Sequence, residues 1–133
     1  MQFIHTSTRL SCDLGRAFRF LTIPSMIEKW SGLESEIDLK KGGNYTLNME
    51  VAGIRIHSDG SRIQAYEREK VLEISWKDTT QPDENYNLLI RFMPCRSDTE
   101  YCSELHLMFK HEDRTLSRSE SEMYGNVFEQ MLE

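Results

Sequence analysis

The sequence predicts an α+β domain in which a curved antiparallel β-sheet of about seven strands wraps around a C-terminal helix. Apolar and polar residues alternate with a period of two through most of residues 35–109, which is typical of half-buried strands. The segments before and after this region instead repeat their apolar residues at helical spacing. A sheet with one long apolar face needs a covering layer, and the last helix is available to supply it.

The length and composition indicate a single globular domain. The chain has 133 residues, 38% of them apolar and 29% charged, which suits one domain over residues 1-133. No apolar run approaches the roughly 18 residues that a membrane-spanning helix needs. The first residues lack a basic region followed by an apolar stretch, so we expect no secretory signal. We therefore expect a cytoplasmic protein without a membrane partner.

The charge pattern argues against a nucleic-acid partner. The net charge is −6, and the basic residues are scattered, with Lys40-Lys41 as their only doublet. A protein that binds phosphates usually shows a basic stripe. The three cysteines, Cys12, Cys95 and Cys102, are too few and odd in number for a disulfide scaffold, and they fit a reducing compartment.

The N-terminal part is predicted to form one strand and two helices. The strand covers residues 3–10. Asp13, with the two residues before it, supplies N-cap chemistry for a helix over residues 14–21. Pro24 is well placed as the first residue of a second short helix that ends at Gly32. The apolar residues of the two helices form one inner stripe each: Leu14, Ala17, Phe18 and Leu21, then Met26, Ile27 and Trp30.

Six strands are predicted to follow these helices. They cover residues 35–39, 45–51, 54–65, 72–77, 87–93 and 105–109. Within the third of them the inward-facing positions change from even-numbered to odd-numbered residues: Ile54 and Ile56 face inward at its start, whereas Ile63 and Ala65 face inward at its end. A one-residue β-bulge at Gly60 would explain the switch and would bend the strand, as a sheet that curls around a pocket requires.

The last hairpin has a register that the sequence alone predicts. A turn centred between Asp98 and Thr99 places every core-face residue opposite another core-face residue. The resulting pairs are Phe92 with Leu105, Ile90 with Leu107, and Leu88 with Phe109.

The chain ends in a predicted amphipathic helix. Ser117 and Glu120 have the spacing of a capping box, as do Ser119 and Glu122. One wide apolar stripe follows, formed by Met123, Tyr124, Val127, Phe128, Met131 and Leu132.

Four segments carry a resemblance to a known family. They read AFRFLTIPSMIEKWSG at residues 17–32, IDLKKGGNYTLNM at 37–49, DGSRIQAYEREKVLEISWKD at 59–78 and SELHLMFKH at 103–111. In this order they resemble the SRPBCC (START-like) superfamily, specifically the branch related to the activator of the heat-shock-protein-90 ATPase (AHSA-like). The resemblance implies a helix-grip fold with a pocket between the sheet and the last helix.

The last helix departs from the family pattern. Relatives usually carry Gly-Trp where this chain has Met123-Tyr124, and they often continue beyond the position of Glu133. We expect that a shorter last helix leaves one end of the pocket more open or needs a partner to cover it.

Twelve residues are predicted to line this pocket, because they fall on the inferred inner faces. For any one of them, a place in an ordinary packed core is the competing interpretation. As a group, apolar side chains around an incompletely filled interior are typical of a small-molecule site. They are Trp30, Tyr45, Leu47, Met49, Ile63, Trp76, Ile90, Phe92, Leu107, Phe109, Tyr124 and Phe128.

No catalytic, metal or cofactor site is predicted. The four histidines, at positions 5, 57, 106 and 111, belong to no nucleophile motif and are expected at the surface or rim. Cys102 and His106 share a strand face, but about 13 Å separates them along the strand, whereas zinc needs each ligand atom within about 2.3 Å. His57 and Asp59 are either an exposed pair or polar anchors of the pocket. Cys95 would lie opposite Cys102, as nearby thiols or as a disulfide.

The residue pattern, together with what the family resemblance implies, supports two functions of different kinds. The first is a non-enzymatic module that binds a small apolar molecule. The second is a protein-interaction module that acts on a chaperone ATPase or another partner, and it predicts an exposed apolar patch. A homodimer that buries such a patch, or a cyclase that folds a reactive polyketide chain in the pocket, remains as an alternative.

Overall fold

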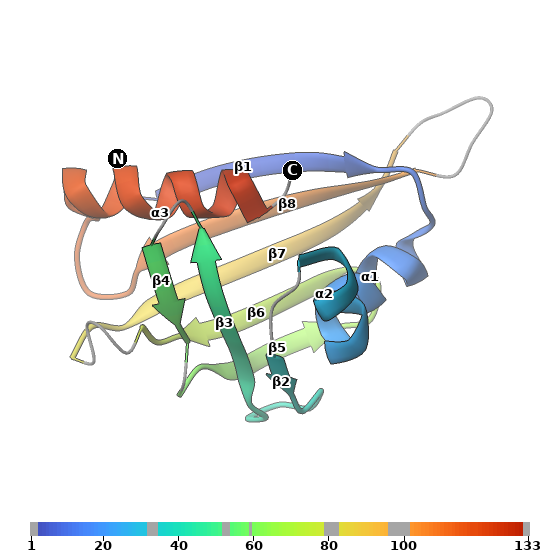
Figure 1. Ribbon diagram of the computed structural model, residues 1–133, viewed down its shortest axis with the longest axis horizontal. Coiled ribbons are helices and arrows are strands. Elements are labelled where there is room, and N and C mark those ends of the chain that lie inside the picture. Colours follow the sequence, from blue (N-terminus) through green and yellow to red (C-terminus); the bar gives the residue numbers. More distant parts are fainter. Residues whose placement is uncertain are drawn as a thin grey trace.

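The computed structural model describes residues 3–31, 35–51, 54–58, 60–78, 83–95 and 102–131 (Figure 1). At residues 30, 31, 49–51, 54–57, 127 and 129–131 it describes the backbone alone. The helices are α1 (Leu14–Thr22), α2 (Pro24–Ser31) and α3 (Arg118–Met131). The strands are β1 (Phe3–Leu10), β2 (Ser35–Ile37), β3 (Tyr45–Val51), β4 (Ile54–His57), β5 (Arg62–Glu67), β6 (Val71–Trp76), β7 (Tyr86–Pro94) and β8 (Ser103–His111).

The strands form two antiparallel sheets that meet at one corner. Five strands pair in the order β1-β8-β7-β6-β5, and three pair in the order β2-β3-β4. A bridge between Asn44 and Arg62 joins β3 to β5, and the Tyr45 backbone N–H donates to the Ser61 carbonyl oxygen across the same junction (3.1 Å). This arrangement confirms the predicted α+β helix-grip fold.

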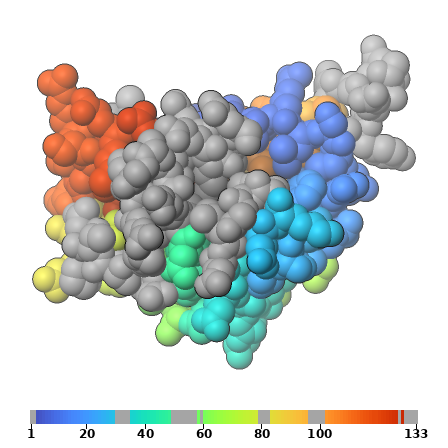
Figure 2. All heavy atoms as spheres, in the orientation of Figure 1, coloured from blue at the N-terminus to red at the C-terminus, as the bar shows by residue number. Residues whose placement is uncertain are grey.

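The shorter strands and the helices lie over one face of the larger sheet. In Figure 1, α3 runs alongside β1, while α1 and α2 lie at the opposite end of the sheet, with β3 between. Figure 2 shows the same two helical ends from outside. Among the described helices, none combines the length and the apolar character that crossing a bilayer requires. The core therefore lies between the five-stranded sheet and these covering elements.

The predicted strand over residues 54–65 is divided into two, so that the described part of the chain has eight strands. At the division, Asn44 pairs with Arg62 and Asn48 pairs with His57. Three residues (45–47) lie between these pairs on one strand and four (58–61) on the other, so the register changes by one residue. Gly60 has a φ of +89°, which glycine adopts without strain. The extra residue thus lies where the sequence predicts a bulge. Ser58 repairs the ladder there, because its Oγ accepts from the Leu47 N–H at 2.7 Å.

A second irregularity corrects one expectation. The register of β5 against β6 shifts between Ile63 and Ala65, which leaves Gln64 as the additional residue. Ile63 is fully buried, but Ala65 is exposed, so the prediction that both face inward is wrong for Ala65. A second bulge so soon after the first gives no signal in the apolar alternation.

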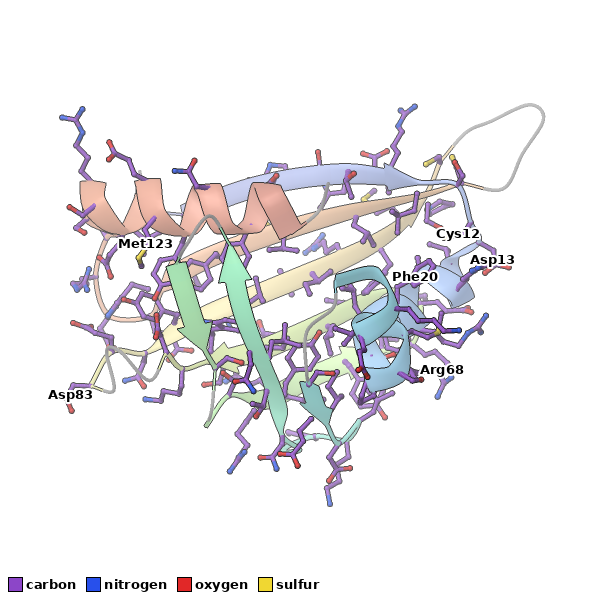
Figure 3. All side chains as sticks on the ribbon, in the orientation of Figure 1. Cys12, Asp13, Phe20, Arg68, Asp83 and Met123 are labelled. Carbon is purple, nitrogen blue, oxygen red and sulfur yellow. The ribbon has the colours of Figure 1, made fainter. Side chains whose placement is uncertain are left out.

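The caps predicted at Asp13 and at Ser117–Glu120 and the hairpin register are confirmed, whereas Ser119 lies inside α3 and Glu122 pairs with Arg118 instead of forming a second capping box. Asp13, at the start of α1 in Figure 3, accepts from the Arg16 N–H at 2.8 Å. Ser117 and Glu120 form a reciprocal capping box: the Ser117 N–H donates to the Glu120 carboxylate (2.9 Å) and the Glu120 N–H donates to Ser117 Oγ (3.1 Å). In the β7–β8 hairpin the three predicted pairs all occur: Phe92 with Leu105, Ile90 with Leu107, and Leu88 with Phe109.

Candidate apolar ligand site

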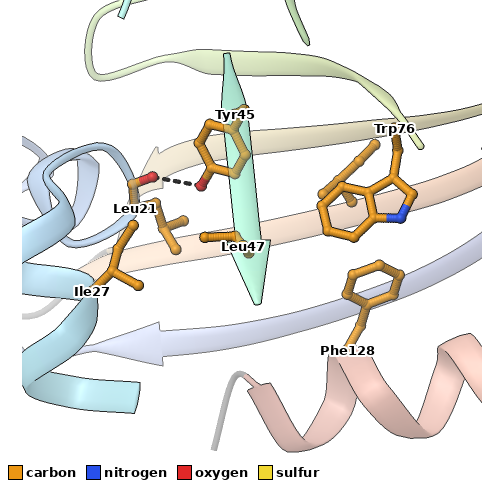
Figure 4. Close-up of a pocket in the computed structure, with 7 residues that line it drawn as sticks. Leu21, Ile27, Tyr45, Leu47, Trp76 and Phe128 are labelled. Carbon is orange, nitrogen blue, oxygen red and sulfur yellow. Dashed lines mark hydrogen bonds between the residues drawn. The ribbon is translucent and has the colours of Figure 1, made fainter. Parts of the chain in front are cut away.

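An apolar cavity lies between the five-stranded sheet and the elements that cover it. Its volume is about 10 Å³. Figure 4 shows how α1, α2, β3, β6, β7 and α3 contribute to its wall. The lining residues are Leu21, Ile27, Tyr45, Leu47, Trp76, Leu88 and Phe128.

The cavity is small for a ligand site. A volume of about 10 Å³ is roughly that of one water molecule, whereas pockets for drug-sized ligands hold about 300–1,000 Å³. A water molecule also needs two or more polar partners, which an apolar lining does not offer. The cavity thus marks a place where packing is incomplete, and a ligand would enter it only if lining side chains moved.

The twelve predicted pocket residues fall into three groups. Tyr45, Leu47, Trp76 and Phe128 line the cavity. The side chains of Trp30 and Met49 lie outside the described part of the structure. The other six are buried in the surrounding core: Ile63, Ile90, Phe92, Leu107, Phe109 and Tyr124.

Three lining residues are missing from the predicted set. Leu21 and Ile27 belong to the inner stripes of the first two helices, and Leu88 belongs to the core face of its strand, so periodicity places all three inward. Periodicity gives the face of a residue but not its depth. Their shared depth depends on how α1, α2 and β7 come together at the cavity, and no local sequence pattern gives that.

Tyr45 provides a polar contact at one side of the cavity. Its hydroxyl donates to the Leu21 carbonyl oxygen at 2.5 Å. That carbonyl lies in the last turn of α1, where the helix itself leaves backbone oxygens without partners. Burial raises the pKa of the Tyr45 hydroxyl, which therefore stays protonated as a donor. The contact ties α1 to β3 and holds the cavity wall in place.

Trp76 stands at the opposite side and has an unused donor. Its side chain is fully buried and its indole packs edge-on against Phe128, with ring centroids 6.1 Å apart. The indole Nε1–H has no hydrogen-bond partner; in the described part of the chain only the Ser35 hydroxyl shares this state. An unpaired buried donor costs about 1–3 kcal/mol.

Beyond Trp76, aromatic rings fix α3 to the sheet. Phe109 contacts the rings of Tyr124 and Phe128 at 4.6 and 5.0 Å between centroids. The Tyr124 hydroxyl donates to the buried Asp78 carboxylate at 2.7 Å. Burial, and then the Asp78 carboxylate, raise the pKa of Tyr124, so this phenol remains a neutral donor.

A charged network anchors the first turn of α3. Glu120 accepts from the Tyr86 hydroxyl at 2.5 Å and from both terminal nitrogens of Arg114, at 2.5 and 3.0 Å. Arg114 also pairs with Glu84 at 3.3 Å. The Arg114 guanidinium is the main cause that holds the pKa of Glu120 far below its usual value, with further help from Tyr86, although burial opposes this.

His111 corrects the expectation that all four histidines lie at the surface or rim. It is buried, and its Nε2 bonds to Glu84, which lies just before β7. This hydrogen bond is the main cause that lowers the pKa of Glu84. His5 is exposed as expected, and His106 is half-buried. The side chain of His57, and Asp59, fall outside the described residues.

The set Cys102, Glu104 and His106 offers no metal site. His106 Nε2 bonds to Glu104 at 2.7 Å, and its Nδ1 lies 3.0 Å from His5 Nε2, so both ring nitrogens are engaged. The described residues contain no group of three or more His, Cys, Asp or Glu side chains arranged to hold an ion. Cys95 lies opposite Cys102, with a backbone hydrogen bond of 3.2 Å, and both thiols are free. The Cys102 thiol, through a hydrogen bond, raises the pKa of Cys95 to about 11.

Comparison with known proteins identifies a family. The model of the family described as "Activator of Hsp90 ATPase homolog 1-like protein" matches residues 11–133. None of the curated proteins compared with the chain matches it.

Several solved structures share the fold. An HSP90 activator from Plasmodium falciparum is 18% identical, with a TM-score of 0.66 over 98% of this chain and 84% of that one. CalU16 from Micromonospora echinospora is 22% identical, with a TM-score of 0.68 over 98% and 71%. Protein NE0264 from Nitrosomonas europaea is 17% identical, with a TM-score of 0.70 over 98% and 91%. At such identities the likeness extends to the fold alone.

Proposed function

The chain belongs to the family of Activator of Hsp90 ATPase homolog 1-like proteins, and on this premise we propose that it binds a small, mainly apolar molecule between its sheet and α3. Binding requires no cofactor and no catalytic residue in this proposal. In this proposal residues 1-133 form one binding domain. It works in the cytoplasm, a reducing compartment in which thiols such as those of its three cysteines stay free.

The observation that carries the proposal is the position of the cavity. Packing is incomplete between the five-stranded sheet and its covering elements, and all seven lining residues are apolar or aromatic. Ligand sites favour such concave apolar places between elements. A ligand would replace contacts among lining side chains by contacts with itself, and it would add apolar burial at roughly 25 cal/mol per Å².

A thermal-shift screen of lipids, flavonoids and polyketide-like aromatics tests this proposal. A compound present at about 100 times its dissociation constant is expected to stabilise the fold by roughly 2.7 kcal/mol. Leu88→Phe should abolish this stabilisation, because the larger ring fills the cavity from β7. The matched control is Leu89→Phe, since the neighbouring residue is half-buried and its side chain points to the other face of the sheet.

The two variants separate a cavity site from a surface site. Leu88→Phe is expected to lose the ligand-induced rise in melting temperature, while Leu89→Phe keeps it. Overpacking by Leu88→Phe costs about 1–3 kcal/mol, so each variant is compared with and without compound rather than with the unmodified protein. A rise that survives in Leu88→Phe, or the absence of any rise across the three classes, would contradict the proposal.

A protein-interaction role is the second candidate, and the family supports it through its chaperone-activator members. The described residues expose three large apolar side chains, Phe3, Tyr66 and Met93. They belong to three strands, and Phe3 and Met93 lie near opposite ends of the sheet, since Met93 pairs with Glu104 whereas Phe3 pairs with Lys110. The described surface thus lacks the contiguous patch that this role, or a homodimer, predicts.

An ATPase assay separates this second candidate from ligand binding. A chaperone activator should accelerate ATP hydrolysis by a purified heat-shock-protein-90 chaperone in proportion to added protein. A polyketide cyclase would instead convert a reactive linear polyketide chain and release a cyclised product. We rank both below ligand binding, because the described surface lacks the contiguous apolar patch of an interaction module and the sequence has no catalytic motif.

A further inference from the structure

Cys95 and Cys102 face each other across the β7–β8 hairpin as a pair of free thiols. They form the next rung of the ladder after Pro94 and Ser103, and the Cys95 N–H donates to the Cys102 carbonyl oxygen at 3.2 Å. A hydrogen bond also joins the two thiols. Both side chains are half-buried, so small reagents in solution can reach them. The two sulfur atoms are therefore held together where a redox reagent has access.

The spacing of this rung allows a disulfide bond after a small adjustment. Opposite residues that are joined by such a backbone hydrogen bond have Cα atoms about 5.5 Å apart, within the range of about 4.4–6.8 Å that disulfides show. Their Cβ atoms are about 5 Å apart, whereas a disulfide needs about 3.5–4.5 Å, so the strand ends must draw closer. A disulfide that forms under such strain is more easily reduced than a structural one.

We propose that Cys95 and Cys102 are a reversible redox site, at which a low-molecular-weight disulfide such as oxidised glutathione produces an intramolecular disulfide bond. The two cysteines lie outside the cavity lining, and strand alternation turns them to the outer face of the sheet, away from the buried Phe92 and Leu105. Oxidation of the pair is therefore independent of ligand binding. In a reducing compartment the thiols persist, and the disulfide forms only when the oxidised small thiol accumulates.

The reaction is thiol–disulfide exchange in two steps. The Cys102 thiolate attacks one sulfur of the small disulfide, breaks its S–S bond and releases the first small thiolate. The Cys95 thiol then loses its proton, attacks the Cys102 sulfur of the mixed disulfide and releases the second small thiolate. The two released thiolates take up the protons that the cysteines lose. The pair is thus oxidised by two electrons, and the reagent is reduced to two thiols.

The surroundings of the pair favour Cys102 as the attacking sulfur. The hydrogen bond with Cys102, and then burial, raise the pKa of Cys95 to about 11, so Cys95 keeps its proton and can donate it to the Cys102 sulfur. The Arg9 guanidinium on β1 opposes this rise through its positive charge, and it also pairs with Glu104 at 3.9 Å. A nearby cation stabilises a thiolate, so Arg9 supports the ionised form that attacks.

Mass spectrometry of the reduced protein after equilibration with oxidised glutathione tests the site. Iodoacetamide should then label one of the three cysteines, namely Cys12, which packs against the core and whose pKa is raised by burial. Trypsin cuts between the paired cysteines, because Arg96 lies between them in the sequence. The tryptic peptides of residues 92–96 and 97–110 should therefore stay linked until a reductant is added.

An early acid quench tests the order of the two steps. Glutathione should first appear on the peptide of residues 97–110, which carries Cys102, and not on the peptide of residues 92–96. Cys95→Ser should keep this adduct, because no second thiol resolves the mixed disulfide. Cys12→Ser is the matched control, and it should form the linked peptides as the unmodified protein does.

The test on the unmodified protein decides without the variants. Return of all three free thiols in a large excess of reduced glutathione is the expected result for a reversible site. Three labelled cysteines after equilibration with oxidised glutathione, a bond that involves Cys12, or a bond that joins two chains would overturn the proposal. A disulfide that survives the excess of reduced glutathione would overturn it as well, and an adduct found first on Cys95 would overturn the order of the steps.

Discussion

Replacement of Phe128 by alanine is expected to lower the free energy of unfolding by about 3–5 kcal/mol. The Phe128 side chain is fully buried, and its ring contacts those of Trp76 and Phe109. Truncation removes this apolar contact and leaves a cavity beside the one already present, because β6 and β8 are held in the sheet and cannot close around it. Urea denaturation followed by circular dichroism measures the loss.

Phe3→Ala is the matched control for this variant. Phe3 is 45% exposed in the edge strand β1, so its truncation should change stability by about 0.5 kcal/mol. Equal losses for the two variants would mean that α3 contributes no more to the core than an exposed strand residue does. Such a result would contradict the claim that α3 covers the core, and with it the claim that a site lies between α3 and the sheet.

Replacement of Glu120 by alanine is expected to cost about 2–3 kcal/mol at pH 7. The carboxylate satisfies Tyr86, Arg114 and the Ser117 N–H, and its side chain is 9% exposed. Removing one partner of a fully buried pair costs about 3–5 kcal/mol, but Arg114 is 40% exposed and water screens its charge, which reduces the loss. Glu122→Ala, four residues from Arg118 and 67% exposed, should cost no more than about 0.5 kcal/mol.

The same variant has a defined pH dependence. The pKa of Glu120 is lower in the folded chain than the value near 4.3 expected in the unfolded chain. The stability that this carboxylate contributes is therefore present above about pH 4.3 and is lost as the pH falls toward the folded-state pKa. The difference between the unmodified protein and Glu120→Ala should shrink as the pH is lowered from 7 to 2. A difference that stays constant would contradict the charged network.

The sequence predicted the parts of the fold that depend on local pattern. The pairing of Phe92 with Leu105 followed from strict alternation on both strands, since a slip of one residue would expose every core side chain. The reciprocal cap of Ser117 and Glu120 followed from capping-box spacing just before an apolar helical stripe. The extra residue near Gly60 followed from a change of parity, which is also local.

The parts that depend on side chains distant in the sequence were beyond prediction. His111 is buried because Glu84, 27 residues earlier, supplies its partner, and nothing in either local segment indicates the pair. The second bulge follows Ile63, which stays buried, and it changes the direction only of residues that are exposed. The pattern of apolar residues therefore gives no sign of this bulge.

The candidate site shows the same division. Strand alternation placed Tyr45, Leu47 and Trp76 on inner faces, and helical periodicity placed Phe128 there, and all four line the cavity. The volume of about 10 Å³ depends on how those side chains interdigitate, which periodicity does not describe. Sequence therefore indicated the walls of a pocket but not how much space lies between them.

Intermolecular nuclear Overhauser effects between methyl-labelled protein and an aromatic compound that raises its melting temperature in the thermal-shift screen test the central claim most directly. If the ligand lies between the sheet and the covering helices, its ring protons should show effects to the methyl groups of Ile27, Leu47 and Leu88, and none to Leu89 on the outer face. Effects confined to Leu89 and other outer-face methyl groups, or no effects to the three cavity residues at saturating compound, would contradict the account.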